Sequence, residues 1–154
     1  MNREIIKELY EHWGDDVFRL CMSYLGSQQD AEDICHSVFL KLLDKRIELF
    51  PGKEKAWLLT AAANECKSQL RRIKRRNMTE LTNDIPFESD SDRQLYEAVM
   101  SIPAKYRSAI HLYYYEGYSQ KEISEILRIS QSAVQTRMSR AREFLRKELS
   151  DYEE

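Results

Sequence analysis

Two helix signals follow one another in residues 119–142 with only three residues between them, and this spacing constrains the fold more than any other feature. The first signal begins at Ser119, with Glu122 three residues later. In such a pair each side chain accepts a hydrogen bond from the other residue's backbone N–H. The first helix should end near Leu127, and Ser130 has the residue type that caps a second helix. Two helices joined by so short a turn form a helix-turn-helix unit.

The second helix of this pair has one apolar side and one polar side. With successive residues 100° apart around the axis, the apolar residues fall within about 60° of one another. They are Val134, Met138, Ala141 and Leu145. The opposite side carries Ser132, Thr136, Ser139, Arg140, Glu143 and Lys147. The pattern predicts a helix that is buried along one face and open along the other.

The open face suits DNA, because the second helix of a helix-turn-helix unit lies in the major groove with its N-terminal residues against base edges. Ser132 and Thr136 are small enough to permit close approach. Gln135 can pair with adenine, and Arg140 can bind guanine or a phosphate. The predicted DNA-binding set is Ser132, Gln135, Thr136, Arg137, Ser139 and Arg140. An ordinary antiparallel helix pair with a solvated basic face is the alternative.

One residue in the turn departs from the common pattern. Many helix-turn-helix turns place glycine where the backbone is left-handed, because a side chain makes that conformation costly. Arg128 occupies that position here. Either the turn has a different geometry, or the strain is tolerated.

The composition favours an all-α fold. Only four glycines and three prolines occur among 154 residues, 32% of which are charged. No apolar run approaches the roughly 20 residues that a membrane-spanning helix needs, so no membrane insertion is expected. The N-terminus also lacks the apolar segment of a signal peptide. Scattered cysteines, odd in number, predict structural thiols in a reducing cytoplasm and no metal site; they are Cys21, Cys35 and Cys66.

Charge is unevenly distributed, although the net charge is only −2. Residues 67–76 carry six basic side chains and no acid, and residues 137–147 carry five basic side chains and one acid. Residues 80–92 carry five acids and no base. Separated basic patches indicate nucleic acid as the first partner to consider.

The apolar spacing divides the chain into two small helical domains joined by a flexible acidic linker. The predicted domains are residues 1–76 and 94–154, and the linker is residues 77–93. The first domain is predicted to hold helices over residues 2–25, 30–43 and 53–76. Each domain is small and should bury only a thin core.

Single residues predict where these helices begin, end and face. Gly14 is a candidate interruption of the first helix, and Gly26 suits its C-terminal end. Asp30 suits the N-terminal cap of the next helix, and residues 50–52, Phe-Pro-Gly, predict a turn. The inward-facing residues expected ahead of the helix-turn-helix unit are Leu95, Val99 and Ile102.

Three stretches together resemble the sigma factors of bacterial RNA polymerase. Residues 112–149, LYYYEGYSQKEISEILRISQSAVQTRMSRAREFLRKEL, resemble the family's fourth conserved region. Residues 30–43, DAEDICHSVFLKLL, are similar to its core-binding helix, and residues 56–72, AWLLTAAANECKSQLRR, to its promoter-melting region. The order of the stretches and the missing middle domain are similar to the ECF (extracytoplasmic function) class. The resemblance implies a transcription initiation factor that reads −10 and −35 promoter elements, helps to melt the promoter and performs no chemistry.

The resemblance implies core RNA polymerase as a partner, through the clamp of its β′ subunit and the flap of its β subunit. The implied clamp contacts are Asp30, Glu32, Asp33, Phe39 and Leu40. His36 and Ser37 stand where the family usually has Gln and Glu. The acids also suit a helix N-terminus without any partner. An anti-sigma factor is a further implied partner, and no cofactor is implied.

The melting region implies a site that captures a base removed from the stack. Such a site needs a pocket, a polar group for the base edge and cations for the strand. Asn64 falls on the family's base-reading asparagine, beside Ala61 and Ala62, and Phe50 and Gly52 lie in the loop that would form the pocket wall. This loop is shorter than usual. The implied phosphate-binding residues are Lys67, Arg71, Arg72, Lys74, Arg75 and Arg76, for which a solvated helix end is the alternative.

The −35 element read by this chain is expected to differ from the common one. In the family's DNA-reading helix an arginine is usual where this chain has Gln135, whereas Thr136 and Arg140 keep the pattern. The difference should lie at the base that faces Gln135. The acidic linker is expected either to pass toward the polymerase active-site channel or to be an ordinary solvated linker.

Three other interpretations stay open. A stand-alone helix-turn-helix regulator would explain residues 119–147 but not residues 30–76. A helical adaptor would bind protein only. An enzyme is disfavoured because the histidines lie far apart in the sequence and no nucleophile or phosphate-loop motif occurs; the histidines are His12, His36 and His111.

Overall fold

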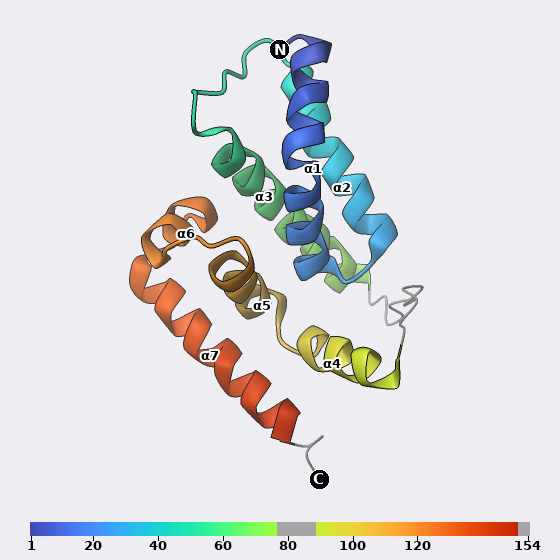
Figure 1. Ribbon diagram of the computed structural model, residues 1–154, viewed down its shortest axis with the longest axis vertical. Helices are drawn as coiled ribbons and strands as arrows, with labels where there is room; N and C mark the ends of the chain where they lie inside the picture. Colours follow the sequence, from blue (N-terminus) through green and yellow to red (C-terminus); the bar gives the residue numbers. More distant parts are fainter. Residues whose placement is uncertain (77–88, 151–154) are drawn as a thin grey trace. The chain divides into compact units, whose positions relative to one another are not determined.

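Over the residues that the structure describes, the chain folds into helices and turns without a strand, which confirms the expected all-α class. The structure is a computed structural model that describes residues 1–76 and 89–150. The chain divides into two compact units, residues 1–82 and 83–154 (Figure 1). No helix within the described residues is long and apolar enough to cross a membrane.

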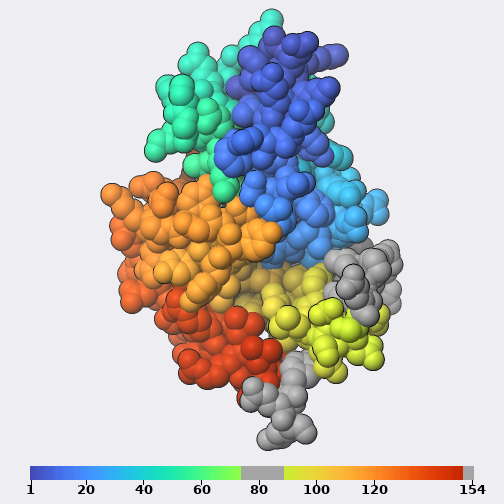
Figure 2. Space-filling model, in the orientation of Figure 1, coloured from blue at the N-terminus to red at the C-terminus, as the bar shows by residue number. Residues whose placement is uncertain are grey.

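Three long helices make up the first unit (Figure 1). Helix α1 (Arg3–Leu25) lies against both α2 (Gln28–Leu40) and α3 (Glu54–Arg76), and α2 also packs on α3. A short 3₁₀ turn, η1 (Lys41–Leu43), extends α2. The loop between η1 and α3 projects beside α1 in the space-filling view (Figure 2).

The ends of α1 and α2 are set by local side chains. Asn2 caps α1 by accepting a hydrogen bond from the Glu4 N–H, and Gly26 ends the helix with a φ of 69°, which glycine adopts without strain. Ser27 caps α2, its hydroxyl accepting from the Asp30 N–H at 3.3 Å. The prediction that Asp30 is this cap is wrong, because the helix begins directly after Ser27. Asp30 lies in the first turn, where its charge still favours the helix.

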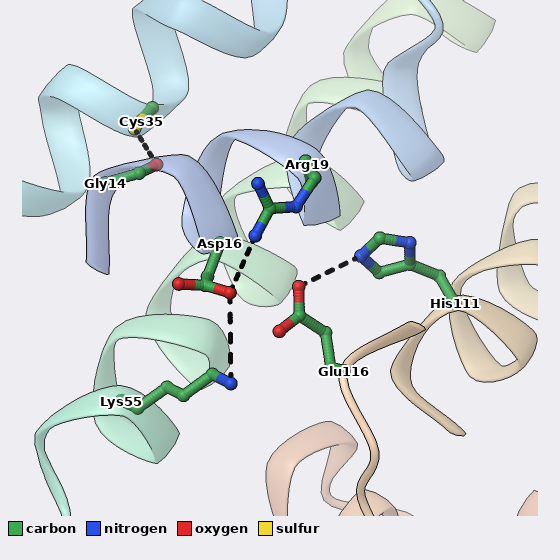
Figure 3. Close-up of polar contacts among 7 residues, drawn as sticks. All are labelled: Gly14, Asp16, Arg19, Cys35, Lys55, His111 and Glu116. Atoms are coloured by element: carbon green, nitrogen blue, oxygen red, sulfur yellow. Dashed lines mark hydrogen bonds and ion pairs between the residues drawn. The ribbon is translucent and has the colours of Figure 1, made fainter. Parts of the chain in front are cut away.

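Gly14 does not interrupt α1, which is continuous through it. Gly14 is buried, and its carbonyl oxygen lies 3.6 Å from the Cys35 sulfur, which donates to it across the α1–α2 contact (Figure 3). A Cβ built on Gly14 would meet the ring of Tyr10 at 3.4 Å. The residue therefore contacts α2 through its carbonyl group and does not break the helix.

The core of the first unit holds all three cysteines. Cys21 and Cys66 have no exposed surface and Cys35 is 3% exposed, which confirms buried, unpaired thiols. A hydrogen bond with Cys66 and burial both raise the pKa of the Cys21 thiol. Burial raises the pKa of Cys35 to about 12. Both thiols therefore stay protonated at neutral pH and pack as small apolar groups.

The second unit is built around its last helix (Figure 1). Its elements are α4 (Asp90–Met100), α5 (Ala104–Ile110), the π-helical turn η2 (His111–Tyr115), α6 (Gln120–Leu127) and α7 (Gln131–Ser150). Helices α4, α5 and α6 all contact α7. A long helix with three neighbours on its apolar side leaves its polar side open.

The start of α4 corrects the predicted end of the linker. The Ser89 hydroxyl caps this helix by accepting from the Asp92 N–H at 3.2 Å, so residues 90–93 are helical. The rest of the predicted linker, residues 77–88, lies outside the described residues. Leu95 does not face inward as expected, because it is 51% exposed.

Ile102 is buried as predicted, and the buried stripe of α4 that leads to it passes through Ala98; each of the two residues is 1% exposed. A buried arginine then joins α4 to α5. Arg107 is 7% exposed, and its Nη1 donates to the carbonyl oxygens of Met100 and Ile102, at the end of α4. Burial lowers the pKa of Arg107 to about 10, so it stays charged at neutral pH while it satisfies these carbonyls.

The buried thiols predict slow reaction with a chromogenic disulfide reagent at pH 8. We expect no fast labelling of the folded chain and labelling of all three cysteines in urea. Because the folded pKa values of Cys21 and Cys35 are raised, unfolded thiols ionise first as the pH passes about 8.5. The free energy of unfolding should therefore be fully maintained below that pH and fall above it. A rapid burst of labelling in the native state would contradict the burial of these groups.

Candidate nucleic-acid interface

The second unit contains the helix-turn-helix pair that the sequence predicts. The capping box of α6 is complete: the Glu122 N–H donates to the Ser119 hydroxyl at 3.1 Å, and the Ser119 N–H donates to the Glu122 carboxylate at 3.0 Å. The Ser130 hydroxyl caps α7 by accepting from the Ala133 N–H at 3.1 Å. Two serine caps thus fix where both helices start.

The turn between α6 and α7 is left-handed at Arg128. Its φ of 57° and ψ of 46° end α6, and it is the one non-glycine residue with positive φ in the described part of the chain. The Ile129 N–H donates to the Ser124 carbonyl at 3.0 Å, which closes the helix end. Of the two alternatives that the sequence left open, the strain is present and tolerated.

Helix α7 is divided into the two faces that its sequence predicts. Val134, Met138 and Ala141 have no exposed surface, and Leu145 is half-buried. Of the predicted DNA-binding set, five residues are exposed: Ser132, Gln135, Thr136, Ser139 and Arg140. Arg137 is half-buried and lies at the edge of this set. We call the five exposed residues the outer face of α7.

An aromatic contact beside the outer face was not predicted. The Nε–H of Arg142 donates to the Tyr114 hydroxyl at 3.2 Å, and the guanidinium carbon lies 5.8 Å from the ring centroid. Tyr106 stacks on Phe144, with ring centroids 6.0 Å apart. Residues 142 and 144 are two positions apart on α7 and so point about 160° away from each other, which places the two contacts on opposite sides of the buried face of the helix. No sequence signal connects Tyr114 to Arg142, because they are 28 residues apart.

The predicted melting residues gather on α3 and the loop before it. Phe50 is 68% exposed, and the Lys53 N–H donates to its carbonyl at 3.0 Å. This bond confirms the predicted turn, in which Gly52 has a φ of 83°. Asn64 is exposed and Ala61 is half-buried. An aromatic ring and an amide are thus open to a partner on this unit.

Ala62 corrects the predicted melting site. It has no exposed surface, because it faces the core of the three-helix unit, and it cannot contact DNA in this fold. Arg71 and Arg72 are exposed, with side-chain bonds to Ser68 and Gln69, and Lys67 is half-buried. The side chains of the other expected cations lie outside the described part of the structure; they are Lys74, Arg75 and Arg76.

The residues expected to contact polymerase are only partly available. Glu32, Asp33 and Leu40 are exposed, Leu40 to 62%, and Asp30 is half-buried. Phe39 is a partial correction: it is 4% exposed and packs edge-on against Tyr10, so it offers a partner little surface although it lines an open hollow.

The exposed Leu40 forms part of two open hollows. One is lined by apolar and basic residues of α1 and α2, including Arg3, Lys7 and His36. The other is formed by the end of α2 and includes Asp33 and Lys41. Leu40 is therefore an exposed apolar residue that a partner bound in either hollow would contact.

Glu65 ties the end of α2 to α3, the helix that carries most of the predicted melting residues. The Lys41 ammonium forms an ion pair with the Glu65 carboxylate, and the Ser37 hydroxyl lies 3.4 Å from it. Glu65 follows Asn64 directly. The expected docking helix and the expected base-reading residue are thus joined within one unit.

Other polar groups in each unit are structural ties. In the first unit, Asp16 binds Arg19 at 2.8 Å and Lys55 at 3.9 Å, which links α1 to α3 (Figure 3). In the second unit, His111 Nε2 lies 3.5 Å from the Glu116 carboxylate, at the end of η2 (Figure 3). Within the described residues, no three His, Cys, Asp or Glu side chains are placed to hold a metal ion.

Comparison with known protein families gives two matches that follow one another along the chain. The family described as sigma-70 region 2 matches residues 9–76, and the family described as sigma-70, region 4 matches residues 92–145. Together they cover most of each compact unit and include α3, α6 and residues 131–145 of α7.

Individual relatives extend over nearly the whole chain. The ECF RNA polymerase sigma factor SigW of Bacillus subtilis is 27% identical over 97% of this chain and 91% of its own length. The RNA polymerase sigma factor SigV of the same organism is 30% identical over 88% of this chain and 85% of its own length. The ECF sigma factor SigE of Mycolicibacterium smegmatis is 30% identical over 94% of this chain, which spans 62% of that relative.

A solved structure shares the fold. It is the sigma factor RpoE of Bartonella quintana, solved with the anti-sigma factor NepR, with a TM-score of 0.77 and 24% sequence identity. The match covers 94% of this chain and 96% of that one.

Replacing Arg128 by glycine is expected to stabilise the second unit. Relief of the left-handed strain, roughly 1–2 kcal/mol, exceeds the added entropy of glycine in the unfolded chain, so the net gain should be about 0.5–1 kcal/mol. Urea unfolding followed by circular dichroism measures it. Both tryptophans, Trp13 and Trp57, lie in the first unit, so the midpoint of their fluorescence should not move. Arg128→Ala is the matched control, because alanine relieves no strain, and a lower midpoint for the glycine variant would contradict the argument.

Proposed function

Because the chain belongs to the sigma-70 family of RNA polymerase sigma factors and to its ECF class, we propose that its two units divide the work of promoter recognition. The first unit docks on core polymerase and holds the opened −10 element. The second unit reads the −35 element through the outer face of α7. The chain itself carries out no chemical step, and it acts in the cytoplasm, where polymerase meets DNA.

The observation that carries the proposal is the geometry of α7. Three fully buried side chains turn the helix so that Arg140, halfway along it, faces outward together with the small polar groups near its N-terminus. This is the part of a recognition helix that meets base edges in the major groove. Gln135 and Arg140 supply the base-reading groups, and Ser132 and Thr136 permit the approach.

The first unit supplies the groups that promoter opening needs. Exposed Phe50 and Asn64 offer an aromatic ring and an amide for a base that has left the stack. Arg71 and Arg72 lie two turns further along α3, where they hold the phosphates of the strand. Lys67 adds a positive charge at the start of the same basic run, and the cations beyond Arg72 extend that run.

Two protein partners are proposed. Core polymerase binds through its β′ clamp on the exposed side of α2, at Glu32, Asp33 and Leu40, with Asp30 at the edge of the contact, and through its β flap on the second unit. An anti-sigma factor regulates the chain by covering these surfaces. RpoE, a protein of the same fold, forms a complex with the anti-sigma factor NepR.

Docking on polymerase should depend on Leu40. A carboxylate at this 62% exposed position would have to be desolvated in an apolar contact, so Leu40→Glu should weaken binding about tenfold or more. Ile5→Glu, at a 47% exposed position on α1 of the same unit, is the matched control and should bind as the unchanged chain does. Gel filtration with bacterial core polymerase measures co-elution at one to one.

Two results would count against this docking surface. Equal loss in both variants would indicate damage to the unit, which circular dichroism would reveal. If the unchanged chain fails to co-elute but binds duplex DNA tightly alone, a stand-alone DNA-binding regulator becomes the better interpretation.

Sequence preference should depend on Gln135. The reconstituted holoenzyme would be mixed with fragmented genomic DNA of its source, and the bound fragments sequenced. Gln135→Arg should change the preferred base at one position of the −35 element by about tenfold or more, since each bidentate contact discriminates by that order. Arg71→Ala, which removes a phosphate contact, should weaken all fragments alike. An unchanged consensus for Gln135→Arg would show that this side chain reads no base.

A further inference from the structure

Arg142 lies beside the outer face of α7 although it is not part of it. It follows Gln135 by seven residues, so the two side chains point within about 20° of each other and stand roughly 10 Å apart along the axis. Both are exposed. The major groove is about 12 Å wide, and its phosphate backbones border a helix that lies in it. Arg142 therefore stands where a recognition helix meets a phosphate.

Within the described residues, the guanidinium of Arg142 uses one of its donors on another side chain. Arginine has five N–H donors in one plane, and the Nε–H is used on the Tyr114 hydroxyl at 3.2 Å. The four N–H groups on the terminal nitrogens form the fork that suits a phosphate. In the described part of the chain, no carboxylate forms an ion pair with Arg142.

Tyr114 is itself held in place. The ring of Tyr113 packs edge-on against it at 4.9 Å between centroids. The π-helical turn η2, closed by the Glu116 N–H donating to the His111 carbonyl at 3.1 Å, sets the direction of both tyrosines. Single π-helical turns are frequent at functional sites. Tyr114 is nevertheless 62% exposed, so its hydrogen bond to Arg142 adds little to stability.

A long exposed arginine is otherwise mobile, and ordering it when a phosphate binds costs affinity. A tyrosine that already holds the arginine lowers that cost. We infer that Tyr114 positions Arg142 to bind a phosphate of the upstream promoter duplex, in addition to the contacts of the outer face. The inference rests on the proposed function of α7. Arg142 is the contacting group, and Tyr114 is a positioning residue that acts through it.

The test uses the full chain with core polymerase, on the promoter duplex recovered by the genomic selection, with affinity measured over a series of KCl concentrations. Arg142→Ala should lower affinity about tenfold, by the same factor on a non-promoter duplex, and reduce the salt slope by about one. Tyr114→Phe keeps the ring but removes the hydroxyl. It should lower affinity about threefold, leave the salt slope unchanged and have no further effect when Arg142 is already alanine. Tyr115→Phe, at a 63% exposed neighbouring tyrosine, is the matched control and should behave as the unchanged chain.

Each other outcome overturns the inference. If Arg142→Ala has no effect, the residue binds no phosphate. If Tyr114→Phe has no effect alone, or adds its full effect to that of Arg142→Ala, Tyr114 does not act through Arg142. In these cases the unchanged holoenzyme still selects promoters and the proposed function stands. If the unchanged holoenzyme selects no DNA sequence at all, the proposed function fails, and this inference fails with it.

Discussion

The burial of three side chains on α7 determines what the second unit can present to a partner. Val134, Met138 and Ala141 have no exposed surface, and burying them fixes the rotation of the helix about its own axis. A rotation by one residue, 100°, would bring these apolar groups to the surface and withdraw the outer face. Because the hydrophobic effect opposes such a rotation, the open face is specified as strongly as the core.

The turn before α7 shows how far this packing can override local preference. Arginine at a φ of 57° is unfavourable by itself, yet the sequence keeps it where glycine would fit without strain. The Ser130 cap on one side and the capping box on the other leave the chain only three residues in which to reverse direction. The tertiary contacts on both sides stabilise that conformation. In the first unit, buried protonated thiols likewise fill part of the core between three helices.

Much of the fold could be predicted from local patterns, because capping and helical period act within a few residues. The Ser119 box, the Gly26 end and the buried stripe of α7 were all predicted and are confirmed. Asp30 was predicted as the cap of α2 in place of Ser27, because both residue types are good N-caps. Only the position at which the helix begins distinguishes them. Leu95 was misplaced because α4 has apolar residues on more than one side, and the folded unit buries Ala98 while Leu95 stays exposed.

The candidate sites were harder to predict, for a different reason. Phe39 and Ala62 lie on helices whose neighbours occupy more than one side, so a residue that matches a functional pattern in sequence can be covered by a helix from elsewhere in the chain. Leu40, one position after Phe39, is exposed because it points about 100° away. The contact of Tyr114 with Arg142 joins residues of η2 and α7 that are 28 positions apart in the sequence, and no local pattern predicts it.

The link through Glu65 has a consequence for how such chains can be altered. Glu65 holds Lys41 and Ser37 from the end of α2, and the next residue back along α3 is the exposed Asn64. Neighbouring residues of a helix move together, so a displacement of the end of α2 would also displace Asn64. The contacts between the two helices therefore have to be kept together when the chain is altered. A chimera that takes α2 and η1 from one family member and α3 from another would keep this tie only if it also carried Ser37, Lys41 and Glu65.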